Sequence, residues 1–318
     1  AAPGGGGGGQ RVLVQLLGAP PPSAGVFDNI AEFSSFGPTL DGRVKPDLIA
    51  PGQLIQSAMA DEEAAEETCA VRVISGTSMA TPFVAGGAVL ARQYFLEGRH
   101  MHPRGEPAPA GAQEPSGPLL KAVLINGAQP MRGLTEGRLP LEDPPSFRQG
   151  WGRMQLSASL PLPQEPPFTL LTVDYARLEW EGEANRYCLG LPPSLDDSDD
   201  APAWAREVTV TLAWHDAPGM PNSWEQALVN DLDLELRGPE GGPAADRGAA
   251  EVPDRLNNVE RASLRAPLPA GARLLVEVSL HRLGWSQAGR GQPYALAASG
   301  PFGSTLCRCG APGCACDD

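Results

Sequence analysis

One stretch of this sequence combines a serine with the local structure that nucleophilic chemistry needs. Residues 73–87 read VISGTSMATPFVAGG. The β-branched residues of 70–75 predict a short strand, Gly76 ends it, and the apolar run over 78–95 predicts a helix. A hydroxyl attacks a carbonyl only when a base removes its proton. Ser78 would lie at the helix start, where unpaired N–H groups and the positive end of the helix dipole stabilise an oxyanion.

A purely structural role for this serine is the alternative, because Thr77 or Ser78 could simply cap the helix. Two glycines inside the helix, Gly86 and Gly87, argue for more than an ordinary helix. Each costs about 1 kcal/mol relative to alanine, so we expect close packing against them. The helix is apolar on nearly every side, which predicts that it is buried on most of its faces.

Three segments follow one another in an order that is specific. They are FSSFGPT at 33–39, DGRVKPDLIAPG at 41–52 and GTSMATPFVAG at 76–86. Together they resemble the subtilisin-like serine proteases (subtilases), whose nucleophile motif is the third segment. The resemblance implies a mostly parallel α/β catalytic domain. It also implies that peptide bonds are hydrolysed through an acyl-enzyme on Ser78, with no cofactor required for the chemistry.

The base and the orienting carboxylate of that mechanism have no counterpart in the sequence. In subtilases both precede the serine, in Asp-Ser/Thr-Gly and His-Gly-Thr motifs. Here all four histidines follow Ser78, at positions 100, 102, 215 and 281. Ser78 is therefore the one catalytic residue that the resemblance transfers. We expect a fragment of a longer serine endopeptidase; the alternative is a non-catalytic pseudoprotease remnant that acts as a binding or stabilising module.

A serine followed by its histidine is the order found in α/β-hydrolases, which use a Gly-x-Ser-x-Gly elbow. This chain has Gly76-x-Ser78-x-Ala80, without the second glycine. His215 and His281 also fall on or beside predicted strands. We therefore rank this reading below the subtilase one.

The rest of the chain predicts a second, all-β part. The run 119–128 predicts a helix that ends near Gly127, and QGWGRM at 149–154 predicts a tight turn. From about residue 168, apolar and polar residues alternate, as in half-buried antiparallel strands of a β-sandwich. Strings such as LAWHDAP at 212–218 resemble the C-terminal jelly-roll-like domain of one subtilase subgroup.

The expected fold class is thus α/β: the C-terminal part of a subtilisin-like, mostly parallel sheet domain, followed by an all-β jelly-roll-like sandwich. The expected domain organisation is a low-complexity glycine tract at 1–10, the C-terminal portion of a catalytic domain at 11–160, a β-sandwich at 165–300 and a Cys-rich tail at 301–318.

Two groups of residues could hold a metal ion. Asp216, Asp231 and Asp233 offer the hard oxygen ligands that calcium prefers, and the resembling subgroup often binds calcium as a structural ion. The alternative is that the last two only form the polar face of a strand. The Cys-x-Cys pairs at 307–309 and 314–316 suit a thiolate metal site, local disulfides or an unstructured tail. Cys69 and Cys188 are expected to be free or buried.

Composition limits the class of partner. The net charge of −14 argues against nucleic acid and against anionic membrane surfaces. No run of 18 apolar residues is present, so no spanning helix is expected, and the start of the chain does not resemble a signal peptide. The family resemblance implies a polypeptide substrate and favours an extracellular or secretory location.

Overall fold

The computed structural model describes residues 28–60, 70–99, 114–135, 139–162, 168–193, 207–219, 227–238, 254–265, 270–286, 289–302 and 307–309. Several predictions fall outside this part of the chain, namely those for residues 1–27, the histidines at 100 and 102, and the cysteines at 69, 314 and 316.

Among the described residues that precede the two large sheets, the structure has one pair of strands and three helices. Strands β1 (Ile55–Ala58) and β2 (Val71–Ile74) pair antiparallel. Helices α1 (Thr77–Leu96), α2 (Gly117–Asn126) and α3 (Leu156–Ser159) follow. The predicted strand, glycine break and helix around Ser78 are therefore confirmed.

Helix α2 carries clear start and stop signals. The Ser116 hydroxyl accepts the N–H of Leu119 at 3.0 Å, and Pro118 fits the first turn, where a missing N–H does no harm. The helix ends before Gly127, as predicted. A side chain at Gly127 would lie 2.4 Å from the backbone nitrogen of Ser159, so glycine allows α3 to pack against the end of α2.

Two four-stranded sheets form the remainder of the described chain. One has the order β3-β9-β5-β7 and the other β10-β4-β8-β6, and every neighbouring pair is antiparallel. Their strands are β3 (Thr169–Leu178), β4 (Ala184–Gly190), β5 (Val208–Trp214), β6 (Asn230–Arg237), β7 (Val259–Leu264), β8 (Arg273–Leu283), β9 (Gln292–Gly300) and β10 (Cys307–Arg308). Apolar side chains from both sheets share one core, as the alternating pattern predicts.

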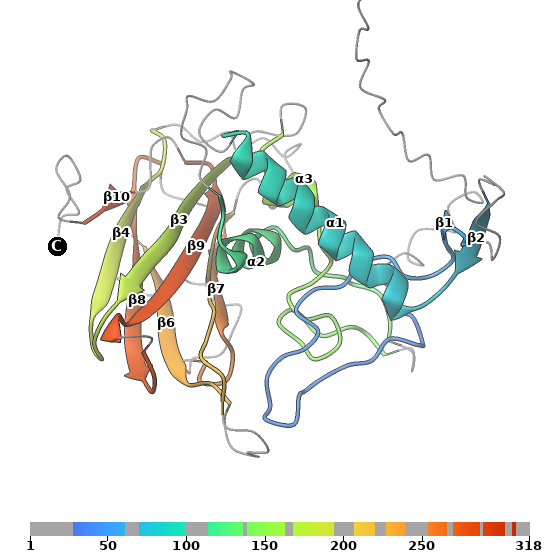
Figure 1. Cartoon of the computed structure of the whole chain (residues 1–318). Coiled ribbons are helices and arrows are strands. Elements are labelled where there is room, and N and C mark those ends of the chain that lie inside the picture. The colour runs from blue at the N-terminus through green and yellow to red at the C-terminus, as the bar shows by residue number, and fades with distance from the viewer. Residues whose placement is uncertain are drawn as a thin grey trace, which may run out of the picture.

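Helix α2 covers the outer face of the β3-β9-β5-β7 sheet and lies between that sheet and α1 (Figure 1). Small residues on the covered face, Ala213, Ala295 and Ala297, leave room for the helix, and all three are fully buried. The side chain of Asn126 at the end of α2 donates to Ser299 at 2.7 Å and accepts from Thr211 at 2.9 Å. The helices and the sheets are therefore joined through a second buried layer.

Two expectations for the helical region are not met. The predicted parallel sheet is not found among the described residues, where the one parallel pairing is an isolated bridge between Ile49 and Arg153. Helix α1 is not buried on most sides either, since only Gly87, Ala91, Tyr94 and Phe95 are buried along its length. The physical reason is the same for both: no described strand lies against the outer side of α1.

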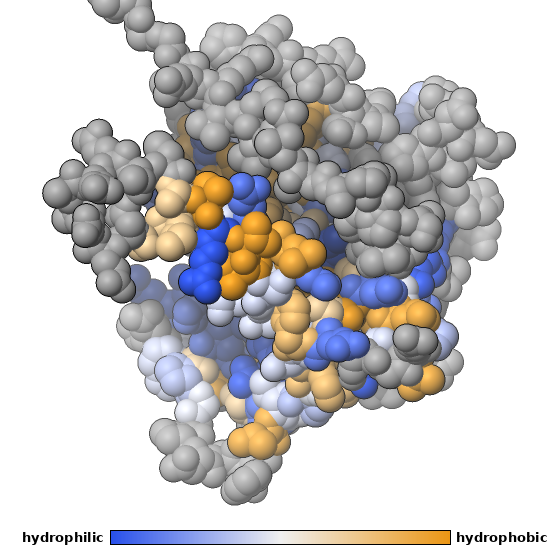
Figure 2. Space-filling model, turned by 90° about the vertical axis from the view of Figure 1, so that its right-hand side faces the viewer, coloured by the Kyte–Doolittle hydropathy of each residue, from blue (hydrophilic) through white to orange (hydrophobic). Residues whose placement is uncertain are grey.

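Apolar side chains consequently face outward on this side of the molecule (Figure 2). On α1, Val89 is 65% exposed and Leu90 is 53% exposed, and on β2 Val71 is 58% exposed. The two glycines of α1 behave differently. A side chain at Gly87 would lie 2.5 Å from the sulfur of Met154, whereas one at Gly86 would meet nothing within 4 Å. The predicted close packing is thus confirmed for Gly87 alone.

Candidate functional site

Ser78 is an exposed residue in the first turn of α1, and it does not cap the helix. The N-cap position is taken by Gly76, which has no side chain to cap with. The hydroxyls on either side are engaged: Ser75 accepts the N–H of Leu54 at 2.8 Å, and Thr81 donates to the carbonyl of Thr77 at 3.0 Å. The capping alternative for Ser78 is therefore wrong. Its hydroxyl makes no hydrogen bond to another described residue.

The start of α1 is held by a tight backbone contact. The N–H of Gly76 donates to the carbonyl of Gly52 at 2.8 Å. A side chain at Gly52 would lie 2.8 Å from the carbonyl oxygen of Gly76 and 3.3 Å from Cβ of Ala80. The turn at residues 50–52 therefore lies directly against the helix start, and only glycine fits at this contact.

The tight turn at residues 149–154 holds the turn at residues 50–52 in place. Ile49 donates its N–H to the carbonyl of Gly152 at 3.0 Å and accepts the N–H of Met154 at 3.0 Å. Gly150 and Gly152 have φ values of 56° and 117°, which side-chain-bearing residues rarely adopt. The tight turn predicted from the sequence is confirmed, and buried Trp151 packs within it.

A charged cluster fixes the same segment to α2. Lys121 of α2 lies 3.0 Å from the carboxylate of Asp47, which also pairs with Lys45. Burial raises the pKa of Asp47, but the two lysine cations outweigh that effect, so its pKa lies below the ordinary value. Asp47 is therefore an ionised anchor. The subtilase-like segment 41–52 acts here as the support of the Ser78 helix.

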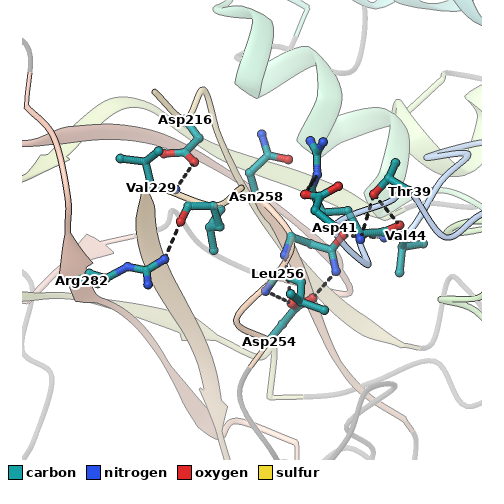
Figure 3. A network of polar contacts seen from close by, with 12 residues as sticks. Thr39, Asp41, Val44, Asp216, Val229, Asp254, Leu256, Asn258 and Arg282 are labelled. Carbon is teal, nitrogen blue, oxygen red and sulfur yellow. Dashed lines mark hydrogen bonds and ion pairs between the residues drawn. The ribbon is translucent and has the colours of Figure 1, made fainter. Parts of the chain in front are cut away.

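No described residue supplies a base to Ser78. His215 and His281 are both exposed, on the loop after β5 and on β8, and neither contacts the serine. The N-terminal end of α1, the turn that contains Ser78, is the end nearer β1 and β2 and farther from the two four-stranded sheets (Figure 1). Asp216, next to His215, has both carboxylate oxygens engaged by the N–H groups of Val229 and Asn230, at 2.7 and 2.8 Å (Figure 3). The α/β-hydrolase reading gains no support from this arrangement.

The three calcium candidates do not come together. Asp231 is 1% exposed and lies 3.4 Å from Arg255, and Asp233 accepts from the same guanidinium at 3.2 Å. Asp216 is engaged by the backbone, as described above. Within the described ranges, no group of three or more His, Cys, Asp or Glu side chains could hold a metal ion. Calcium binding therefore remains a prediction, with Arg255 already supplying positive charge to two of the candidates.

The structure brings a further acid, Glu260 of β7, close to this cluster. One of its oxygens accepts the N–H of Leu234 at 2.6 Å; the other has no hydrogen-bond partner, as is also true of Asp231 Oδ1. Burial raises the pKa of Glu260 well above its ordinary value, and neighbouring Asp233 and Asp254 act in the same direction. No local pattern signals this burial, because it depends on β6 lying beside β7.

The cysteines correct one expectation. Cys188 on β4 and Cys309 are both disulfide-bonded, so Cys188 is not free. Their sulfur atoms lie 3.5 Å apart, too far for a bond between these two. β10 pairs with β4 at Cys307 and Cys188, which brings the start of the Cys-rich tail onto the sheet. Of the three alternatives for the Cys-x-Cys pairs, a metal site, disulfides or an unstructured tail, the structure has a disulfide at Cys309.

The comparison with protein families assigns the region around Ser78. Residues 24–152 match the model of the subtilase family. This range contains the support segment, the nucleophile helix and the tight turn described above. This part of the chain therefore belongs to the subtilase family of serine proteases, as the sequence motifs predicted.

Relatives with known names extend the similarity beyond that range. The chain is 31% identical over 277 residues to the Serine protease/ABC transporter B family protein tagB of Dictyostelium discoideum, covering 73% of this chain and 14% of that protein. It is 32% identical over 283 residues to tagD of the same organism, covering 73% and 15%. A C5a peptidase of Streptococcus pyogenes is 43% identical over 75 residues, covering 23% and 6%. The chain thus spans a small part of the length of each of these relatives.

A membrane-spanning helix was not expected, and among the described helices none has the length and apolar character to cross a bilayer.

Proposed function

We propose that this chain is the nucleophile-bearing part of a serine endopeptidase, which hydrolyses peptide bonds in polypeptides through an acyl-enzyme on Ser78. The observation that supports this most strongly is the state of Ser78 itself. It is exposed in the first turn of α1, with its hydroxyl unengaged by any described residue, inside a segment that belongs to the subtilase family.

The chemistry follows from that placement. Ser78 Oγ bonds to the carbonyl carbon of the substrate while a base takes the hydroxyl proton. The N–H groups of Met79 and Ala80 donate to the carbonyl of Gly76, so those of Thr77 and Ser78 at the start of α1 stabilise the oxyanion that forms. The C–N bond then breaks, the amine leaves with the proton, and water hydrolyses the ester on Ser78. The base and its orienting carboxylate are supplied by residues outside the 318 of this chain.

The second candidate is the non-catalytic module, and one specific observation favours it. Neither histidine that the structure describes, His215 or His281, contacts Ser78, and no histidine precedes it in the sequence. In that case the sheets would serve as a binding or stabilising unit, with Ser78 a remnant. The two candidates differ in one respect only, which is whether the native gene product brings a base to Ser78.

The experiment uses the full-length product of the native gene, defined by sequencing the 5′ end of its transcript. We expect it to cleave an unfolded protein substrate, and Ser78→Ala to abolish cleavage. Ser157→Ala is the matched control, since Ser157 lies on α3, outside the first turn of α1, and its hydroxyl accepts from Gln155 at 2.7 Å; it should leave the rate unchanged. A full-length product without an upstream histidine motif, or equal cleavage by Ser78→Ala, would exclude the protease function.

An oxidising location is part of the proposal. The two disulfide-bonded cysteines, Cys188 and Cys309, support it, because such bonds persist mainly in secreted and extracellular proteins. We expect mass spectrometry of the exported native protein to find both cysteines resistant to alkylation before reduction. Ready alkylation of both without reductant would contradict this part of the proposal.

A further inference from the structure

A hollow of about 430 Å³ lies where the subtilase segment meets the sheets. Its walls come from both sides of that junction. Arg43 and Lys121 contribute from the subtilase segment and α2, while His215, Asp216 and Asn258 contribute from the loops next to β5 and β7. Figure 3 shows Asp216 and Asn258 in this region, with Asp41, the partner of Arg43, beyond them.

The acceptor groups of this hollow are already engaged. Both oxygens of Asp216 accept backbone N–H groups. The Asn258 amide donates to the Trp214 carbonyl at 2.8 Å, and its oxygen accepts from Lys121 at 3.4 Å. A cation that enters the hollow would therefore have to displace hydrogen bonds of Asp216, the carboxylate that lines it.

The donor groups are the ones left open. Arg43 uses its Nε on Asp41 at 2.7 Å, which leaves both terminal nitrogens of the guanidinium without a partner among the described residues. Lys121 has three N–H groups, of which two are used by Asp47 and Asn258. The exposed imidazole of His215 adds a further donor.

The first turn of α2 contributes to the same wall. Gly117 lines the hollow, and a side chain placed there would meet nothing within 4 Å, so this backbone opens toward free space. The N–H groups of this turn are mostly engaged, because Pro118 has none and Leu119 and Leu120 donate theirs to Ser116. The attraction for an anion therefore comes from the charged side chains. The positive groups also crowd one another: burial, Lys45 and Arg43 together hold the pKa of Lys121 below its ordinary value in spite of the nearby Asp47.

We infer that this hollow, which we call the junction pocket, binds a small organic oxyanion, a carboxylate or a phosphate, held by Arg43, Lys121 and His215. The volume exceeds what a single inorganic ion fills, and residues 217–219 after Asp216 offer a less polar wall for the carbon part of such a ligand. The site is separate from Ser78 and does not depend on the proposed protease function. A ligand there would bridge the subtilase segment and the sheets and so stabilise their junction.

The test is calorimetric titration of the disulfide-intact 318-residue chain with citrate, glycerol phosphate and inorganic phosphate, and with choline as a cationic comparison. We expect saturable binding of at least one organic anion, a raised melting temperature in its presence and no binding of choline. Citrate and glycerol phosphate distinguish the carboxylate from the phosphate. Binding of choline but of no anion, or of none of the four compounds, overturns the inference.

Variants locate the binding. Lys121→Met and Arg43→Gln should each lower the affinity for the anion by about tenfold, which is the effect of one lost charge-assisted hydrogen bond. Arg99→Gln is the matched control, since its guanidinium pairs with Glu97 at the far end of α1, and it should change affinity by less than about twofold. Since Lys121 also anchors Asp47, Arg43→Gln decides the matter if Lys121→Met fails to fold. Unchanged binding in a folded Arg43→Gln protein overturns the assignment to this pocket.

Discussion

The guanidinium of Arg261 lies over the indole ring of Trp151, with its carbon 5.1 Å from the ring centre. Arg261 belongs to β7 and Trp151 to the tight turn of the subtilase segment. The same guanidinium donates to the carbonyl of Ile125 at the end of α2, at 3.2 Å. Burial lowers the pKa of Arg261 to about 10, so it stays charged at neutral pH. One cation therefore joins the sheet, the helix and the turn.

Replacing that cation should loosen the junction. We expect Arg261→Ala to lower the free energy of unfolding by about 2–3 kcal/mol, since it removes a desolvated cation–π contact and a charge-assisted hydrogen bond. Urea denaturation measures this. Arg99→Ala, which removes only an exposed ion pair, should change the value by less than about 1 kcal/mol. If the two substitutions lowered the free energy of unfolding equally, Arg261 would stabilise the junction no more than an exposed ion pair does.

The buried carboxyl of Glu260 should make stability depend on pH. Its pKa in the folded protein is raised well above 4.5, mainly by burial. The unfolded chain therefore releases this proton first as pH rises, and the stability present below about pH 4.5 is lost progressively up to the folded pKa. Asp231, whose pKa burial also raises, acts in the same direction. We expect Glu260→Gln to be more stable than the parent at neutral pH.

Urea midpoints of the two proteins between pH 5 and pH 8 test this expectation, with the pH range set by the ordinary and raised carboxyl pKa values. The difference in urea midpoint by which Glu260→Gln exceeds the parent should grow as pH rises. Glu114→Gln, at a side chain that is 66% exposed, is the control and should run parallel to the parent. A Glu260→Gln protein that loses stability at every pH would mean that the acid is needed in its ionised form.

Glycines near Ser78 should respond in opposite ways to an added methyl group. Gly52→Ala places Cβ 2.8 Å from a backbone oxygen that cannot move freely, so we expect a lower melting temperature and a displaced helix start. Gly86→Ala meets nothing within 4 Å and gains up to about 1 kcal/mol of helix propensity, so this chain should become more stable. Differential scanning calorimetry compares them. Destabilisation by Gly86→Ala would show that the outer side of α1 is covered in solution.

The apolar outer side of α1 should cause self-association of this chain. Leu90 is 53% exposed there, and exposed apolar patches of this kind promote aggregation. We expect Leu90→Glu to shift the protein toward the monomer in size-exclusion chromatography with light scattering. Leu40→Glu is the control, because Leu40 is 86% exposed but lies outside α1. A parent chain that is already monomeric at high concentration would contradict this prediction.

Local pattern predicted most of the elements correctly, because their signals lie within a few residues. The alternation of apolar and polar residues after about residue 168 predicted antiparallel strands such as β6, and Gly127 marked the end of α2. The burial of β5 on both faces was not predictable, because Ala213 faces a helix that is distant in the sequence. The expected parallel sheet and buried α1 rested on neighbours that the described chain does not provide.

For the candidate site too, features set by neighbouring residues were predictable, and features set by distant contacts were not. The motif predicted that Ser78 lies at a helix start, and the order of the histidines led us to expect its base outside this sequence. The junction pocket could not be foreseen, since it brings Arg43 together with His215 across most of the chain. The burial of Glu260 escaped prediction for the same reason: both arise from contacts between segments that no local pattern records.

The central claim is that Ser78 is a protease nucleophile whose base lies outside these 318 residues. A fluorophosphonate probe tests it directly, because such a probe bonds only to an activated serine. Applied to the full-length native product, the probe should label Ser78 stoichiometrically, and Ser78→Ala should abolish the labelling. Applied to the 318-residue chain under the same conditions, it should leave Ser78 unlabelled. Stoichiometric labelling of Ser78 in the isolated chain, or none in the full-length protein, would contradict the account.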